Sequence, residues 1–229
     1  MAEKDQIAKP LLTAKDLRDM GEKAEFCELV DGELVKTSPG FLPEARVVRT
    51  VLLLLGTFVA QHCLGEVFGP DLGYELTTHR VRAPDVSFVS AEKLVAYGNP
   101  LEFAKVVPDL AVEVISPEVK YGYLQRKIRD YFEAGVRLLW IIDPQMQTVT
   151  VYHSPVDLRI LTAADALPGE EVLPGFSCRV GELLAKGAGR TRRSQDKVGV
   201  ALPYLMTFLG GNAVSCRRVV TVSEAGTAA

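Results

Sequence analysis

Cysteine and histidine are scarce in this chain, and their positions exclude the common metal-binding motifs. Four cysteines and three histidines are scattered along 229 residues, with no CxxC pair and no Cys/His spacing of the kind that binds zinc. Neither a zinc site nor a disulfide framework is indicated. No apolar run approaches the roughly 20 residues of a membrane-spanning helix. The charged start MAEKDQ leads into no signal-peptide core, so we expect a cytoplasmic protein.

An excess of positive charge is also missing. The formal net charge is −3 at pH 7, and it is unevenly distributed along the chain. From Lys186 onward there are seven basic and two acidic residues, which makes this tail about +5 and leaves the remainder about −8. Because phosphate groups are bound by Lys and Arg, the acidic body argues against nucleic-acid binding.

Three segments are predicted. Residues 1–23 form a helical lead-in, with Thr13 as N-cap and Asp16 as the capping acid. Residues 24–185 form one α/β domain. Residues 186–229 form a basic tail, rich in Gly, Ser, Arg and Ala, that we expect to be disordered.

The spacing of apolar residues predicts an alternation of short strands and helices in the central segment. Asp31-Gly32 between two alternating stretches predicts a tight hairpin. Apolar spacing predicts a long helix over 43–62 and a second over 123–134, ended by Gly135. Strands are predicted at 65–68, 73–76, 85–89, 109–115, 138–142, 148–152 and 158–161, followed by a small helix at 181–185.

Glu113 is the first candidate for a chemical role. It lies in the middle of the apolar stretch DLAVEVI (109–115), and alternation places it on one face with Ala111 and Ile115. An ionised carboxylate inside a sheet is unfavourable by several kcal/mol unless a cation or a full set of hydrogen bonds compensates it. The alternatives are therefore a metal or catalytic site and a structural ion pair with a buried Lys or Arg.

Asp85 and Lys127 complete the candidate site. Pro84 cannot donate to a sheet, so the strand begins at Asp85, whose carboxylate is predicted at the strand end. Lys127 shares a helix face with Leu124, Ile128 and Tyr131, while Arg126, Arg129, Asp130 and Glu133 are predicted on the opposite face. A lysine on the apolar face has an acid or phosphate as partner, or extends along the edge of that face to water. Two carboxylates and a lysine at strand ends suit magnesium-dependent phosphodiester hydrolysis.

An ordered series of short motifs carries a family resemblance. The series consists of ELVDGELV (28–35), SPG (38–40), RAPDVSFV (82–89), DLAVEVISP (109–117), KIRDYFEAGV (127–136) and LWIIDP (139–144). It resembles the Uma-two family of restriction endonuclease-like proteins, within the PD-(D/E)XK superfamily, over roughly residues 24–184. The resemblance implies an α/β (α+β) fold in which a mixed β-sheet is flanked by helices, with Mg²⁺ as cofactor and DNA as substrate.

The resemblance also assigns residues to the site. It implies that Asp85 and Glu113 are the metal-binding acids and that Glu28 adds a further acid. Ile115 stands where the motif's lysine is usual, and the resemblance implies that Lys127 replaces that lysine. A local basic groove is predicted from Arg80, Arg82, Lys120, Arg126, Lys127 and Arg129. The alternatives are an inactive nucleic-acid-binding or regulatory module on the same scaffold and a hydrolase of another phosphate ester; a homodimer is left open.

Overall fold

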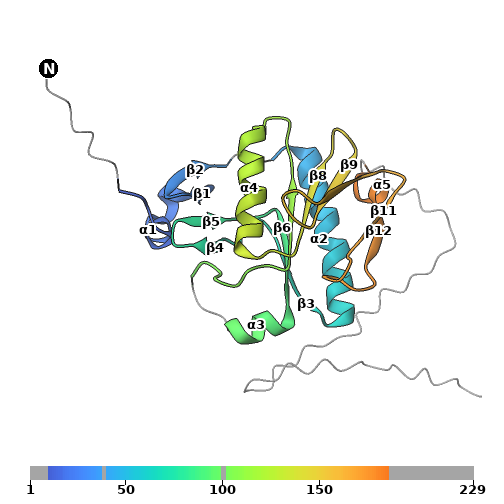
Figure 1. The fold of residues 1–229 in the computed structure, drawn as a ribbon, viewed down its shortest axis with the longest axis horizontal. Coiled ribbons are helices and arrows are strands. Elements are labelled where there is room, and N and C mark those ends of the chain that lie inside the picture. The colour runs from blue at the N-terminus through green and yellow to red at the C-terminus, as the bar shows by residue number, and fades with distance from the viewer. Residues whose placement is uncertain (1–9, 38–39, 99–101, 186–229) are drawn as a thin grey trace, which may run out of the picture. The chain divides into compact units, whose positions relative to one another are not determined.

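A six-stranded mixed sheet forms the centre of the described structure (Figure 1). The computed structural model describes residues 10–37, 40–98 and 102–185. The predicted tail (186–229), residues 1–9 of the helical lead-in and two residues of the SPG motif (38–39) therefore lie outside the described residues. The strand order is β10-β9-β8-β7-β6-β3. The strands are β3 (Gly65–Phe68), β6 (Val86–Ser90), β7 (Leu110–Val114), β8 (Leu138–Asp143), β9 (Thr148–Tyr152) and β10 (Leu158–Thr162).

Two helices cover opposite faces of this sheet. Helix α2 (Leu42–His62) contributes Val47, Val51, Leu55 and Val59, at helical spacing, to the larger core beneath β6–β9. Helix α4 (Tyr121–Ala134) packs on the other face through Ile128 and Tyr131. It connects β7 to β8, which pair in parallel, whereas the other pairings within this sheet of the described chain are antiparallel. A parallel pair needs such a crossover, and α4 supplies it.

A second, four-stranded sheet lies between α4 and the first helix. Its strand order is β2-β1-β5-β4, formed by β2 (Glu33–Lys36), β1 (Cys27–Val30), β5 (Arg80–Arg82) and β4 (Tyr74–Thr77). Its Leu29 and Val81 pack against Leu17 of α1 (Ala14–Asp19). Alternation along the strands directs the neighbouring Glu28 and Arg82 to the other face, toward α4. This small sheet thus brings polar residues to the buried side of α4.

The remaining elements are short. They are the 3₁₀ turn η1 (Gly21–Ala24), α3 (Ala91–Tyr97), the hairpin of β11 (Ala166–Pro168) and β12 (Ser177–Arg179), and α5 (Val180–Leu183). None of the described helices combines the length and apolar character that crossing a membrane requires.

Most predicted elements are present, with ends that differ by one or two residues. Positive φ angles of 49° at Asp31 and 79° at Gly32 confirm the tight hairpin turn. Thr13 and Asp16 form the predicted capping box, and Gly135 ends α4 in the left-handed conformation. Strands β5, β11 and β12, helix α3 and the 3₁₀ turn η1 were not predicted. The predicted fold class, a mixed sheet flanked by helices, is confirmed.

Candidate active site

Glu113 and Asp85 are brought together at the end of β7. Glu113, 7% exposed, extends from β7 toward α4, as alternation predicts. Asp85 directly precedes β6, and its Oδ2 accepts a hydrogen bond of 2.7 Å from the backbone N–H of Val114. No described residue donates a hydrogen bond to the other oxygen of Asp85. Glu113 is therefore almost fully buried, and Asp85 has one carboxylate oxygen that can still accept a ligand.

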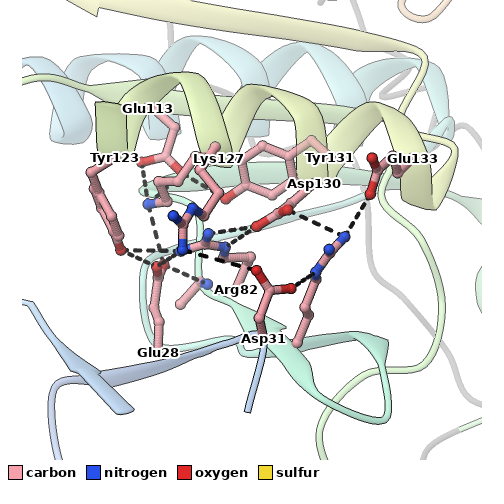
Figure 2. Close-up of polar contacts among 12 residues, drawn as sticks. Glu28, Asp31, Arg82, Glu113, Tyr123, Lys127, Asp130, Tyr131 and Glu133 are labelled. Atoms are coloured by element: carbon pink, nitrogen blue, oxygen red, sulfur yellow. Dashed lines mark hydrogen bonds and ion pairs between the residues drawn. The ribbon is translucent and has the colours of Figure 1, made fainter. Parts of the chain in front are cut away.

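Three donors on one face of α4 contact the acids (Figure 2). Tyr123, Lys127 and Tyr131 recur at intervals of four residues, so they lie along one face of the helix. The Lys127 ammonium lies 2.8 Å from both carboxylate oxygens of Glu113 and 3.2 Å from Oε1 of Glu28. The Tyr131 hydroxyl donates to Glu113 Oε1 at 2.5 Å, and the Tyr123 hydroxyl donates to Glu28. Lys127 thus contacts both Glu113 and Glu28.

Glu28 is the most heavily hydrogen-bonded of the acids. Its Oε2 accepts from Arg82 Nη1 at 2.6 Å and from the Tyr123 hydroxyl. Its Oε1 accepts the backbone N–H of Ala83 at 3.1 Å and contacts the Lys127 ammonium. An ionised carboxylate has about four acceptor positions, and these four contacts fill them. Glu113 has three such contacts, so it keeps one acceptor position for a further ligand.

Arg82 and Asp130 extend the network behind Glu28. Arg82 is fully buried, and its Nε and Nη2 both contact Oδ2 of Asp130, at 2.9 and 2.5 Å. The prediction that Asp130 lies on the exposed face of α4 is wrong, because Asp130 is 2% exposed. The small sheet packs against the flank of α4 and covers this position. Arg80 also contacts Asp130 but is shared with Asp31 and Glu133.

The acids differ in how easily they ionise. Burial raises the pKa of Glu113 to about 7, and the negative charges of Asp85 and Glu28 act in the same direction. Burial also raises the pKa of Asp85. Burial opposes ionisation of Glu28 too, but Lys127 and Arg82 outweigh it and lower the pKa of Glu28 to about 2. The pKa of Lys127 is raised, because Glu113 and Glu28 outweigh its burial. The lysine is therefore an ammonium donor at neutral pH.

The charge balance leaves room for a cation. Four carboxylates, those of Glu28, Asp85, Glu113 and Asp130, share two buried cations, Arg82 and Lys127. Arg82 contacts Glu28 and Asp130, and Lys127 contacts Glu28 and Glu113, so Asp85 is the one of these four acids that forms no ion pair with a described residue. Among the described residues, no group of three or more Asp, Glu, His or Cys is placed to hold a metal. Two carboxylates nevertheless suit Mg²⁺, which usually keeps several waters and takes one or two protein carboxylates.

The basic residues near the site differ from the predicted groove. Arg82 and Lys127 are buried among acids, and Arg80 is shared by three of them, so these cations are neutralised within the protein. Lys120, Arg126 and Arg129 are exposed on or beside α4. Of the six residues of the predicted groove, these three are therefore the ones exposed for contact with phosphate.

Asp130, Tyr123 and Tyr131 were not predicted to take part in this cluster, and Arg82 was predicted near the site only as part of a basic groove. The tyrosines could have been found, because they stand four residues before and after Lys127 and carry hydroxyls on the same helix face. The pairing of Arg82 with Asp130 depends on how the small sheet packs on α4, and no local pattern in the sequence signals it.

Comparisons with known proteins agree with this fold. A family model described as "Putative restriction endonuclease", the Uma2 family, matches residues 14–181. The crystal structure of a "putative nuclease belonging to DUF820" from Anabaena variabilis ATCC 29413 is similar, with a TM-score of 0.67 and 17% sequence identity. The similarity covers 76% of this chain and 97% of that one. No curated protein matches the sequence significantly. Because the family model spans most of the sequence, the chain belongs to the Uma2 family.

Proposed function

We propose that the protein is a Mg²⁺-dependent nuclease that hydrolyses phosphodiester bonds of DNA. The observation that carries the proposal is the pair of buried acids at the end of β7: Asp85, which has an oxygen without a hydrogen bond from any described residue, and Glu113, which the ammonium of Lys127 holds. Asp85 would bind the ion through its oxygen without a hydrogen bond, and Glu113 through its remaining acceptor position. The chemistry that the bound ion supplies is polarisation of the phosphodiester and acidification of the attacking water.

Lys127 acts in this proposal as a fixed positive charge. Its three N–H groups face Glu113 and Glu28, and its raised pKa keeps it protonated, so it cannot accept a proton from water at neutral pH. Its part is to hold the Glu113 carboxylate in place for the ion. The Tyr131 hydroxyl also holds Glu113, because it donates to Oε1, an oxygen that Lys127 contacts as well.

Nicking of a supercoiled plasmid tests the proposal. We expect Mg²⁺-dependent nicking by the wild type, its abolition by EDTA, and a loss of at least about a hundredfold in Asp85→Asn and Glu113→Gln. Glu118→Gln removes an exposed acid from the segment between β7 and α4 and is expected to leave the rate unchanged. Equal nicking by the wild type and Asp85→Asn would show that these acids are not the active site.

The same assay separates the alternatives. A protein that binds DNA but cleaves no nucleic acid would be an inactive binding or regulatory module on this scaffold. Hydrolysis of a small phosphodiester such as bis(p-nitrophenyl) phosphate without DNA cleavage would indicate another phosphate ester as substrate, which suits the acidic body. A cytoplasmic location and a homodimer also stay proposals, to be tested by fractionation and by light scattering.

A further inference from the structure

We propose that Glu28 and Tyr123 are positioning residues for Lys127 and that Glu28 is not a metal ligand. The inference rests on the proposed function for its kinetic part and on the geometry of Glu28 for the rest. All four acceptor positions of Glu28 are engaged by Arg82, Tyr123, Ala83 and Lys127. A metal ion could bind Glu28 only by displacing one of these donors.

The surroundings of Glu28 also keep it ionised and fixed. It is 2% exposed and comes from β1, whereas Glu113 comes from β7 of the other sheet. The Lys127 ammonium is therefore held by one acid from each sheet, Glu28 and Glu113. A lysine side chain has four rotatable bonds, and the second acid removes the freedom that a single partner would leave.

Tyr123 is an uncharged residue that holds Glu28 in place. Its hydroxyl donates to Glu28 Oε2, and its ring lies 5.3 Å from the Arg82 guanidinium and 5.9 Å from the Lys127 ammonium. The ring therefore faces both cations that hold Glu28, at distances where cation–π attraction operates. Removing only the hydroxyl should loosen Glu28, and through it Lys127, without changing the charge of the site.

The test compares Tyr123→Phe with Tyr121→Phe. Tyr121 is 76% exposed on the same helix and is the matched control. In Tyr123→Phe we expect kcat for plasmid nicking to fall about tenfold, the effect of losing a hydrogen bond to a charged group, with KM within twofold of the wild type. We expect the dissociation constant for Mn²⁺, measured by electron paramagnetic resonance, to stay within twofold. Tyr121→Phe should match the wild type in all three quantities.

A second pair of variants separates positioning from metal binding. Asp85→Asn should weaken Mn²⁺ binding at least about tenfold, because it removes a carboxylate ligand. Glu28→Gln should weaken it much less, although it lowers kcat at least as far as Tyr123→Phe. If Glu28→Gln weakened Mn²⁺ binding as much as Asp85→Asn does, Glu28 would be a ligand and the proposal would be wrong.

Nitrogen-15 NMR of the lysine ammonium provides a readout that does not depend on activity. Buried, hydrogen-bonded Lys127 should give a protected ammonium signal, identified by its absence in Lys127→Arg. The signal should broaden through faster hydrogen exchange in Tyr123→Phe and stay sharp in Tyr121→Phe. An unchanged signal in Tyr123→Phe would overturn the positioning role. If the wild type cleaved no DNA, the nuclease proposal would fail, while the Mn²⁺ and NMR measurements would still decide the role of Glu28.

Discussion

Arg82 and Asp130 form a buried ion pair in which two guanidinium nitrogens of Arg82 contact one carboxylate oxygen of Asp130. The pair links two separate elements of the fold. The guanidinium comes from β5 and the carboxylate from α4, and both side chains are shielded from water. Because Arg82 also contacts Glu28, one side chain fixes the small sheet against α4 and holds an acid of the site.

The first prediction concerns the stability that this pair provides. Arg82→Met leaves Glu28 and Asp130 buried without their shared partner, so the free energy of unfolding should fall by about 3–5 kcal/mol. Urea denaturation followed by circular dichroism measures the change. Arg126→Met, at an exposed position on α4, is the control and should stay within about 0.5 kcal/mol of the wild type. A loss for Arg82→Met no greater than that of the control would contradict a structural role of the pair.

The second prediction concerns acid pH. The pKa of Glu28 is lowered to about 2 from an ordinary value of 4.5, so its ionised form stabilises the folded state. This contribution is complete above pH 4.5 and is lost as the pH falls toward 2. Glu28→Gln should therefore be less stable than the wild type at pH 6, and the difference should shrink between pH 4.5 and 2. Urea midpoints measured across this range check the trend; a constant difference would argue against a lowered pKa.

The third prediction uses two glycines with opposite expected effects. Gly65 begins β3 with a φ of +147°, and an added Cβ would lie 2.1 Å from the carbonyl oxygen of Val89. Gly65→Ala should destabilise the protein by at least about 2 kcal/mol. Gly56, inside α2, has open space around its Cβ position, so Gly56→Ala should stabilise by about 0.5–1 kcal/mol. Thermal unfolding of both variants gives the two changes in melting temperature. Changes of the same sign would contradict the argument from backbone conformation and space.

The fourth prediction concerns DNA binding by the exposed cations of α4. Arg126 and Arg129 lie on the exposed side of this helix, near the site. The double variant Arg126→Ala/Arg129→Ala should bind DNA more weakly and reduce the slope of log K against log salt by up to about 2, roughly 0.9 for each phosphate contact. Fluorescence anisotropy in EDTA, at several salt concentrations, gives the slope.

The control for this prediction lies on the other helix. Arg46 and Arg49 are exposed on α2, which covers the opposite face of the sheet. Arg46→Ala/Arg49→Ala removes the same charge and should leave the slope close to that of the wild type. Equal losses in both double variants would mean that the binding depends on net charge and not on the α4 surface.

The sequence was sufficient for the parts of the site that depend on local periodicity. Alternation in β7 put Glu113 on the α4 side, and helical spacing put Lys127 on the buried side of α4; the structure confirms both orientations. Which of these residues bind a metal stays a prediction. Asp130 was misplaced because the apolar pattern of α4 shows one packed face, whereas the small sheet buries a second face through ion pairs. Polar contacts between distant segments leave no periodic signal.

The ionic cluster also bears on how the chain folds. Its contacts join residues that are far apart in sequence: Arg82 to Glu28 across 54 positions and Tyr123 to Glu28 across 95. Loops of this length must close before such contacts contribute any free energy, so we expect the cluster to assemble after the local hairpins and helices. A chain still emerging from the ribosome lacks the site until α4 has been synthesised, and no shorter N-terminal fragment can contain it.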